Sequence, residues 1–416
     1  MWYAPVLALA LGIMMLRLGL LAAYLSPEEF GLLAFGLLVS SGQVILGAFG
    51  LQQLVQRDLP GLIVMGRETD ALRLIMQTGL FSLACFLLLL PLYLIGPLFA
   101  AYPAEVWVIG LGHGLSQQLF LLATTESRSR GDPLVFAKDN LYRAILVAVL
   151  SFTAILFGYS ALTILVVESA ASALLSLTRF RSIFAATSAS VRPIVFDAAL
   201  GILRLPWSNA LFLMAASLLT YGLLNIDRWV ASLWLDKVLF ANYAFLSIGL
   251  MMAQSLQSLL NAAAFPMIAR RHATKGAGSA FKLARNLSLA CLGAGLIVGP
   301  ALVLLSHSII EAWFPRYIDT IPLTWTILIL AVLRLSDFHS TYLLVTGHER
   351  TLTLINLIVL AVACLVLSQM GLQGFSVNTH PLQTVTSFAM YVGIAHYGAV
   401  IVMTYRYRKP PLNHKL

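Results

Sequence analysis

The sequence predicts an all-α polytopic membrane protein of about 12 transmembrane helices, in two parallel six-helix repeats that form an N-lobe and a C-lobe around a central cavity. Of its 416 residues, 60% are hydrophobic and only 10% are charged, whereas a soluble domain has about a quarter of its residues charged. The apolar residues gather in long runs separated by short connectors. Two stretches of sequence also recur later in the chain, which indicates a duplication.

A helix that crosses a hydrocarbon layer of roughly 30 Å needs about 20 mostly apolar residues. The stretches that meet this length are 4-24, 30-54, 72-100, 104-125, 139-158, 160-178, 208-234, 238-265, 285-307, 320-345, 351-370 and 384-405. We expect the first six to form an N-lobe over 1-180 and the last six a C-lobe over 208-416. A cytoplasmic linker over 181-207 would join them.

Basic residues predict the orientation, because cytoplasmic loops carry an excess of Lys and Arg. With both termini in the cytoplasm, the inner connectors hold nearly all of the basic residues, and the outer connectors hold only Lys237 and Arg316. We therefore expect a multi-pass protein of the lipid bilayer with both termini cytoplasmic.

The predicted duplication depends on two sequence echoes. LSPEEFGLLAF at 25–35 aligns without a gap with LDKVLFANYAF, 210 positions later. The identical pairs are Leu25 and Leu235, Phe30 and Phe240, Ala34 and Ala244, and Phe35 and Phe245. In the second echo, Gly131, Asn140 and Leu141 recur with the same spacing as Gly347, Asn356 and Leu357. Because an even number of predicted helices separates the two copies, both halves are expected to have the same orientation.

Three basic residues, Arg17, Arg228 and Arg334, lie inside predicted spans and not near their ends. A basic side chain at the centre of a span costs roughly 2.5 to 3.5 kcal/mol on insertion scales, so it usually faces a wet cavity or a partner. The offset of 210 maps Arg17 onto Asp227, beside Arg228. One interpretation is an anion-attracting cavity between the halves. In the other, Asp227 neutralises Arg228, and Arg17 snorkels or contacts a backbone carbonyl.

Polar side chains follow one face of two predicted helices. On one helix they are Tyr221, Asn225 and Arg228, and on the next they are Gln254, Gln257, Ser258 and Asn261. Amides supply both hydrogen-bond donors and acceptors, which suits ligands with many hydroxyl groups such as sugars. The alternative is hydrogen bonding between helices, worth about 0.6 kcal/mol per bond in membranes.

Acidic residues inside spans are candidates for ion coupling. Glu168 is the lone acidic group of its span, so it is either a partner for an arginine or a coupling site for a proton or cation. Arg334, Asp337 and Thr341 share a helix face, and the i, i+3 spacing favours an ion pair between Arg334 and Asp337. On another helix, His113, Gln117 and Gln118 are weaker binding candidates.

Several function classes are excluded by what the sequence lacks. It contains no HExxH, GxSxG, Walker loop, dinucleotide fingerprint or paired cysteine motif, so we expect no enzyme and no cofactor. The net charge is +9, but no Lys/Arg run with interleaved aromatic residues indicates nucleic acid. Cys85, Cys291 and Cys364 lie in apolar runs without His or Asp at metal-ligand spacing, so we expect small core residues and no metal site.

Three segments carry a resemblance to a known family. LSPEEFGLLAFGLLVSSGQVILGAFGLQQLVQRDL resembles the first-loop and second-helix region of the polysaccharide and lipid-linked oligosaccharide flippases (O-antigen flippase type). This family belongs to the multidrug/oligosaccharidyl-lipid/polysaccharide exporter superfamily. NIDRWVASLWLDKVLFANYAFLSIGLMMAQSLQSLLNAAAFPMIARR is similar to the family's helix 7 to 8 region, with its charged DR pair, and LLVTGHERTLTLINLIVLAVACLVL to its helix 10 to 11 connector.

The resemblance implies a two-lobed flippase of the bacterial cytoplasmic (inner) membrane that works by alternating access. Its cargo would be an undecaprenyl-diphosphate-linked oligosaccharide, passed to the outer leaflet for O-antigen, capsule or exopolysaccharide biosynthesis. Arg17, Arg228 and Arg334 would attract diphosphate or acidic sugars, and Arg57 would receive the diphosphate at headgroup level. The energy source would be H⁺, Na⁺ or the membrane potential, and a polysaccharide polymerase and a chain-length regulator would be partners.

Two other functions compete with this one. A drug or cation exporter of the same superfamily would depend on acidic cavity groups, for which Asp227, Asp337 and Glu168 are the candidates. A membrane-embedded glycan polymerase or ligase is disfavoured because the predicted outer loops are too short to house its active site.

Overall fold

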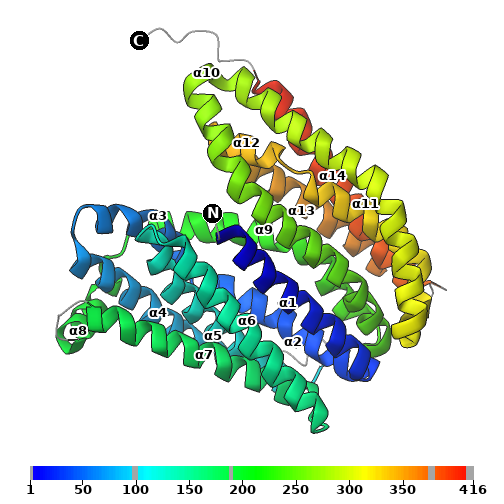
Figure 1. Ribbon diagram of the computed structural model, residues 1–416, viewed down its shortest axis with the longest axis horizontal. Coiled ribbons are helices and arrows are strands. Elements are labelled where there is room, and N and C mark those ends of the chain that lie inside the picture. The colour runs from blue at the N-terminus through cyan, green and yellow to red at the C-terminus, as the bar shows by residue number, and fades with distance from the viewer. Residues whose placement is uncertain (1–2, 96–101, 187–190, 373–379, 409–416) are drawn as a thin grey trace. The chain divides into compact units, whose positions relative to one another are not determined.

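The computed structural model describes residues 3–95, 102–186, 191–372 and 380–408, and the chain divides into two compact units, Met1–Tyr221 and Gly222–Leu416. We call them the N-unit and the C-unit. Across the described residues every regular element is a helix and none is a strand, which confirms the all-α fold class (Figure 1).

The N-unit is a bundle of long helices. Its described elements are α1 (Tyr3–Tyr24), α2 (Pro27–Leu46), α3 (Leu51–Val64), α4 (Glu68–Leu94), α5 (Ala104–Ser129), α6 (Pro133–Leu156), α7 (Ala161–Ala186), α8 (Val191–Gly201), the 3₁₀ turn η2 (Ile202–Arg204) and the first part of α9 (Trp207–Trp234). α5 packs against α2, α4 and α7, and α1 packs against α6. The helix α5 is therefore the centre of this unit, which explains why most of its residues are buried.

The C-unit begins within α9. It continues with α10 (Lys237–Trp313), the 3₁₀ segment η3 (Pro315–Leu323), α11 (Thr324–Leu335), α12 (His339–Val345), α13 (Glu349–Leu372) and α14 (Pro381–Arg406). α10 is 77 residues long and folds back on itself at Gly276, where φ is 75° and ψ is 176° (Figure 1). A glycine is needed there because side chains rarely adopt this backbone conformation.

Eleven helical segments of the described chain are long and apolar enough to cross a membrane. One of them is α10, whose two arms correspond to the separate predicted helices 238-265 and 285-307. Counting the arms separately brings the number among the described residues to the predicted twelve. The protein is therefore a multi-pass membrane protein.

The first sequence echo is repeated in the structure. Ser26 caps α2 by accepting a hydrogen bond from the backbone N–H of Glu29, and Asp236 caps α10 in the same way with Leu239. Phe35 stacks on Tyr102 at a centroid distance of 3.9 Å, and its equivalent Phe245 stacks on Tyr317 at 4.4 Å. A side-chain N-cap and a stacked aromatic pair thus occur at equivalent positions of the second helix in each half.

The second echo also has a structural counterpart. Gly131, at the turn between α5 and α6, has φ 81°, and Gly347, at the turn between α12 and α13, has φ 77°. In each turn the glycine N–H and the next N–H donate back to carbonyls of the preceding helix, as in a Schellman motif. Helix α5 packs with α2 and α7 as α11 packs with α10 and α14. These shared features support duplication of a six-helix unit.

Two predicted helices are broken. The predicted helix 30-54 ends as α2 at Leu46, and α3 starts separately at Leu51 after Phe49 (φ 49°) and Gly50 (φ 79°), both in the left-handed region. The predicted helix 320-345 is interrupted at 336–338, between α11 and α12. Hydropathy missed both breaks because the residues that make them are mostly apolar or small.

The cysteine prediction is wrong for one residue. Cys364 on α13 is exposed, and Cys85 and Cys291 are half-buried. In a membrane protein, apolar residues on a helix face either neighbouring helices or lipid, so hydrophobicity alone does not identify the core.

The contact between Gly50 and α9 predicts a specific effect of Gly50→Ala. A Cβ at this position would lie 1.9 Å from the carbonyl oxygen of Ala210, and φ is 79°. Gly66→Ala is the matched control, because Gly66 has φ 70° but no heavy atom within 4 Å of the new Cβ. The control carries only the left-handed penalty of roughly 1–2 kcal/mol.

We expect Gly50→Ala to lower the melting temperature of the detergent-purified protein clearly more than Gly66→Ala does, as measured by scanning fluorimetry. Equal shifts for both variants would contradict the close packing of this turn on α9.

Candidate functional site

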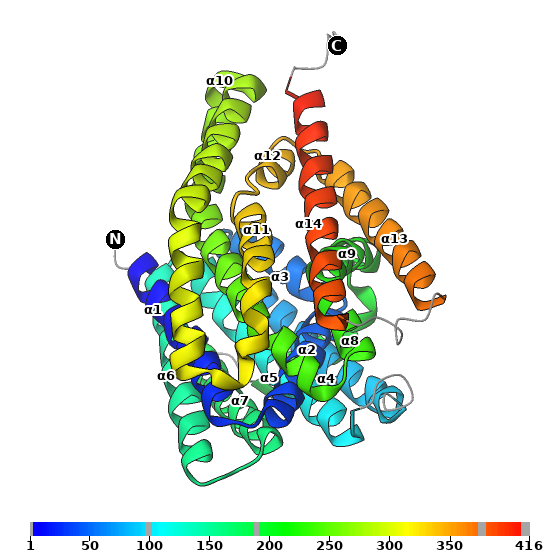
Figure 2. The same cartoon turned by 90° about the vertical axis from the view of Figure 1, so that its right-hand side faces the viewer.

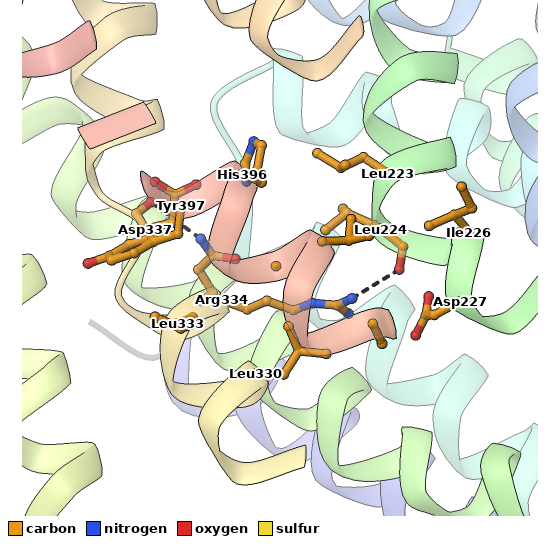
Figure 3. Close-up of a pocket in the computed structure, with 14 residues that line it drawn as sticks. Leu223, Leu224, Ile226, Asp227, Leu330, Leu333, Arg334, Asp337, His396 and Tyr397 are labelled. Carbon is orange, nitrogen blue, oxygen red and sulfur yellow. Dashed lines mark hydrogen bonds between the residues drawn. The ribbon is translucent and has the colours of Figure 1, made fainter. Parts of the chain in front are cut away.

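The C-unit contains a pocket between α9, α10, α11 and α14 with a volume of about 60 Å³ (Figure 3). Most of its lining is apolar. The polar and charged side chains that line it are Asp227, Gln257, Arg334, Asp337, His396 and Tyr397. Several residues predicted as site residues are therefore brought together here from different helices.

Arg334 extends across the pocket towards Leu224 and Asp227 on α9 (Figure 3). Its Nη2 donates to the carbonyl oxygen of Leu224 at 3.3 Å. Its Nη1 is buried and has no hydrogen-bond partner among the described residues. This guanidinium thus retains a free donor group in an apolar setting, where an unsatisfied charge is costly.

The predicted ion pair between Arg334 and Asp337 is wrong. Arg334 is in the last turn of α11, which ends before the break, so the two residues do not share a continuous helix. The Asp337 carboxylate instead accepts hydrogen bonds from the backbone N–H of Ser340 at 3.0 Å and from its hydroxyl at 2.6 Å. Asp337 thus stabilises the first turn of α12.

Asp227 and Arg228 do not neutralise each other. Asp227 Oδ2 accepts a hydrogen bond of 2.6 Å from the hydroxyl of Tyr243 on α10, and Oδ1 is buried without a partner in the described part of the chain. Arg228 Nη1 donates to the side chain of Asn225 at 3.4 Å. Its Nε and Nη2 are buried and have no hydrogen-bond partner among the described residues. Neighbours on a helix project in different directions, so adjacency in sequence did not produce a pair.

The four polar residues predicted on one face of α10 have different surroundings. Gln257 lines the pocket and donates to the backbone carbonyl of Asp337 at 3.3 Å. Asn261 accepts a hydrogen bond from Thr341 at 3.0 Å. Ser258 is exposed and bonds within its own helix to the carbonyl of Gln254. Only Gln257 therefore contributes to the pocket, and Asn261 connects helices.

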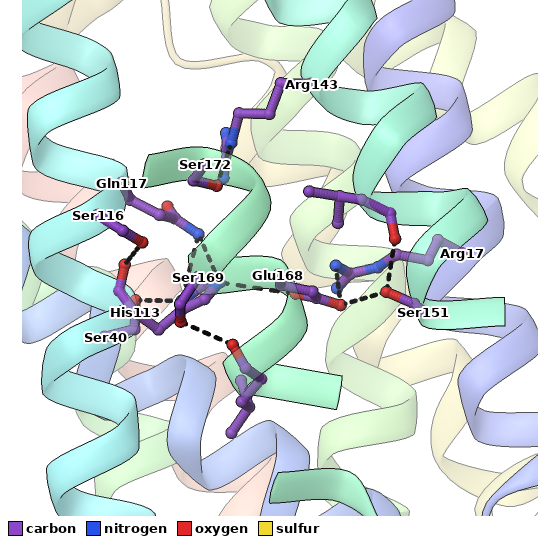
Figure 4. Close-up of polar contacts among 12 residues, drawn as sticks. Arg17, Ser40, His113, Ser116, Gln117, Arg143, Ser151, Glu168, Ser169 and Ser172 are labelled. Carbon is purple, nitrogen blue, oxygen red and sulfur yellow. Dashed lines mark hydrogen bonds and ion pairs between the residues drawn. The ribbon is translucent and has the colours of Figure 1, made fainter. Parts of the chain in front are cut away.

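Arg17 and Glu168 form a buried ion pair in the N-unit, between α1 and α7 (Figure 4). Arg17 Nη1 lies 2.5 Å from Glu168 Oε1, and the side chains are 4% and 1% exposed. Ser151 on α6 donates to the same carboxylate oxygen at 2.7 Å. Of the alternatives for Glu168, the structure therefore favours a partner for an arginine.

His113 extends this network towards α2. Its Nε2 lies 3.6 Å from Glu168 Oε2, and its Nδ1 lies 2.8 Å from the hydroxyl of Ser40 (Figure 4). The side chain is 1% exposed, so it is buried among these helices. Gln117 approaches the same imidazole ring, whereas Gln118 bonds to Ser82.

Two other predicted residues lie outside both clusters. Arg57 on α3 is 52% exposed and pairs with Asp58, and this hydrogen bond raises the pKa of Arg57 above its ordinary value. The hydroxyl of Tyr221 contacts Ser41 and the carbonyl of Leu38 on α2. Tyr221 therefore joins helices of the N-unit.

Sequence reasoning missed three polar residues that take part in these sites. Tyr243 holds Asp227, and His396 lines the pocket and contacts Asn356 at 3.0 Å. Arg143, near the start of the predicted span 139-158, lies within α6 and donates to Ser172 on α7 at 3.0 Å. The signal for Arg143 and His396 was their place inside apolar runs, as for Arg17.

No family model matches the sequence, and no curated protein matches it. Solved structures do match the fold. An inward-facing multidrug resistance MATE family transporter of the MOP superfamily is similar with a TM-score of 0.62 and 16% identity, over 98% of this chain and 96% of that chain. A mutant of the MATE transporter VcmN from Vibrio cholerae is similar with a TM-score of 0.61 and 16% identity, over 97% of this chain and 96% of that chain.

A MOP superfamily transporter from Pyrococcus furiosus is also similar, with a TM-score of 0.57 and 12% identity over 98% of this chain and 97% of that chain. These matches cover nearly the whole of each chain. The protein therefore has the fold of MATE transporters of the MOP superfamily.

The buried ion pair of the N-unit predicts non-additive mutational effects. Removing one partner leaves an uncompensated charge and typically costs about 3–5 kcal/mol, whereas replacing both by apolar residues is often close to neutral. We expect Arg17→Leu and Glu168→Leu each to reduce folded yield and melting temperature strongly, and the double variant to recover most of the loss. The exposed pair offers a control, Arg57→Ala, worth at most about 1 kcal/mol.

The measurement is the melting temperature and the monodisperse fraction of each purified variant. Additive losses in the double variant would show that the two charges do not stabilise each other.

Proposed function

We propose that the protein is an alternating-access transporter whose cargo is an undecaprenyl-diphosphate-linked oligosaccharide repeat unit, moved from the cytoplasmic to the outer leaflet of a bacterial inner membrane. The product would serve surface polysaccharide biosynthesis, as O-antigen, capsule or exopolysaccharide. A polysaccharide polymerase and a chain-length regulator would act on it next.

The observation that carries this proposal is the incomplete pairing of Arg334 in the C-unit pocket. Its Nη1 is buried without a hydrogen-bond partner among the described residues, as is Nη2 of Arg228 on α9, while the carboxylate of Asp337 accepts hydrogen bonds from Ser340. Guanidinium groups with free donors bind phosphate and carboxylate oxygens well, because their planar fork matches two oxygens at once. This arrangement supports an anionic cargo.

The size of the pocket defines which part of the cargo it would hold. Its volume of about 60 Å³ is well below the 300–1,000 Å³ of typical ligand pockets. In this conformation it would accept one charged group, such as a phosphate or a sugar carboxylate. Gln257 and His396 line the same pocket and supply neutral polar groups for hydroxyls.

The fold supports transport as the class of function. MATE family transporters of similar fold are described in inward-facing and outward-facing conformations. For the Pyrococcus furiosus transporter, a reverse polarity of the binding pocket is said to suggest a different function. The polarity of the pocket is therefore the feature on which we base the cargo class.

A drug or cation exporter is the second candidate, and one observation favours it. Asp227 Oδ1 is buried and has no hydrogen-bond partner among the described residues, so this carboxylate retains an acceptor for a cation. In our leading proposal the same oxygen is the best candidate for coupling to H⁺ or Na⁺, because Glu168 is held by Arg17 and the Asp337 carboxylate accepts two hydrogen bonds from Ser340.

A deletion strain tests the proposed cargo. We expect polyprenyl-diphosphate-linked glycan to accumulate on the cytoplasmic face only, measured by mass spectrometry together with a membrane-impermeant sugar probe. Susceptibility to cationic compounds should not change.

Three other results would each reject the flippase. Normal levels of the lipid-linked glycan, with probe labelling at the outer face, would show that this glycan is not the cargo. Raised susceptibility to cationic compounds would favour the exporter. Normal translocation with altered chain length or attachment would indicate a polymerase or ligase.

Variants of Arg334 and Asp227 separate the two candidates. Loss of a hydrogen bond to a charged group costs about 1.5–3 kcal/mol, so we expect Arg334→Ala to lower glycan translocation about tenfold or more at normal abundance. Arg334→Lys should restore part of it. Ile329→Ala, at an exposed position on the same helix α11, is the matched control and should leave translocation unchanged.

The cation exporter predicts the opposite dependence. In that case Asp227→Asn would abolish resistance to cationic compounds, and Arg334→Ala would leave it intact.

A further inference from the structure

One end of the C-unit gathers basic side chains from three places in the chain. They come from the turn of α10, the start of α13 and the end of α14, which lie at the same end of the unit (Figure 2). The exposed members are Arg270, Arg271, Lys275, Lys282, Arg350, Arg406 and Arg408, and Arg285 is half-buried. We call this set the basic end.

Aromatic contacts hold these segments together. Phe281, just after the α10 turn, packs edge to face on Tyr405 of α14 at a centroid distance of 4.9 Å. Tyr342 of α12 donates to the backbone carbonyl of Tyr407 at 3.1 Å. The ring centroids of His348 and Tyr407 lie 4.0 Å apart. The basic residues therefore project from a fixed platform.

The charges of the basic end are not neutralised by the protein. No carboxylate of the described chain forms an ion pair with any of these residues, and Glu349 is the acidic residue nearest to them in sequence. In the N-unit the basic residues are of two kinds, because Arg67, Arg73, Arg130 and Arg179 have carboxylate partners, whereas the exposed Arg128, Lys138 and Arg181 have none among the described residues. The basic end is distinguished by its size, because it brings seven exposed basic residues without such partners to one end of the unit.

The basic end is continuous with apolar surface on the same helices. Met267, shortly before the basic residues of α10, is 53% exposed, and Val402, one turn before Arg406 on α14, is 66% exposed. Such apolar surface faces the hydrocarbon of a bilayer, and the basic residues that follow it are then at the level of the headgroups.

We propose that the basic end of the C-unit is a binding surface for the phosphate groups of anionic phospholipids. We assign the bound phosphate to a membrane phospholipid, because the surface borders apolar helix faces and its charges come from several helix ends. A diphosphate from a lipid-linked glycan is the alternative source of the same chemistry. The proposal does not depend on the identity of the transported cargo.

Electrostatic attraction to anionic lipid is worth about 1 kcal/mol per Lys or Arg near the surface, which corresponds to about fivefold in binding. Removing three charges should thus lower the preference for anionic over zwitterionic lipid by roughly 100-fold at low ionic strength. The preference should also fall as salt rises, because these exposed charges are screened.

The test uses the full chain in nanodiscs of phosphatidylcholine with increasing phosphatidylglycerol. Native mass spectrometry after release counts the phosphatidylglycerol molecules that stay bound. The variant is Lys275→Gln, Lys282→Gln and Arg406→Gln together. The matched control changes three exposed basic residues of the N-unit that the described structure leaves without carboxylate partners, Arg128→Gln, Lys138→Gln and Arg181→Gln.

We expect the wild type and the N-unit control to retain phosphatidylglycerol and the C-unit variant to lose it. The charge-preserving variant Lys275→Arg, Lys282→Arg and Arg406→Lys should retain it. Equal loss in the variant and the control, or no loss in either, would overturn the proposal.

A second arm distinguishes the source of the phosphate. Undecaprenyl diphosphate or inorganic pyrophosphate is added at the same concentration as phosphatidylglycerol. Retention of bound phosphatidylglycerol in the presence of the diphosphate supports a phospholipid-binding surface. Its displacement from the wild type would overturn the proposal in favour of a diphosphate site. Failure of the flippase test with deletion strains would leave this result unaffected.

Discussion

The cost of an uncompensated charge in the hydrocarbon layer is the constraint on which this structure depends. Each guanidinium inside a span must be paired, or must face a group that the protein does not supply. The N-unit pairs its charge, since Arg17 lies 2.5 Å from Glu168 and Ser151 satisfies the same carboxylate. In the C-unit, neither Arg334 nor Arg228 forms an ion pair with a carboxylate of the described chain. The two units thus differ in how they compensate a buried guanidinium, and our proposed site is based on the C-unit, where no ion pair does so.

Duplication makes this contrast informative. The echoes share their helix caps, their stacked aromatic pairs and their left-handed glycine turns, so the two units inherited the same framework. The charged positions diverged on that framework, since the offset that pairs Phe35 with Phe245 places Asp227 opposite Arg17. Asp227 bonds to Tyr243 and not to an arginine. Framework residues are constrained by packing in both units, whereas the charged residues were free to take different roles.

The sequence was sufficient to predict the membrane-spanning segments, because their number and length follow from hydropathy and bilayer thickness. It was also sufficient to identify Arg17, Arg228 and Arg334 as residues that need an explanation. The residues that contact these charged side chains could not be predicted from the sequence. Glu168 meets Arg17 only through the packing of α1 beside α6 and α7, and Tyr243 reaches Asp227 from another helix. The error on Arg334 and Asp337 came from a helix break that hydropathy does not detect.

That break supports our proposal of a binding site in the C-unit pocket. Irregular backbone within a membrane is tolerated where it is buried in protein or lines a cavity, because lipid cannot satisfy its N–H and C=O groups. The interruption between α11 and α12 lies at the pocket, where Gln257 donates to the Asp337 carbonyl. The protein itself satisfies the backbone of the break, because Asp337 N–H donates to the Arg334 carbonyl and Phe338 N–H to the Ser336 carbonyl. Arg334 and Asp227, which line the same pocket, each keep a buried polar atom without a partner among the described residues, and a bound group would compensate for both.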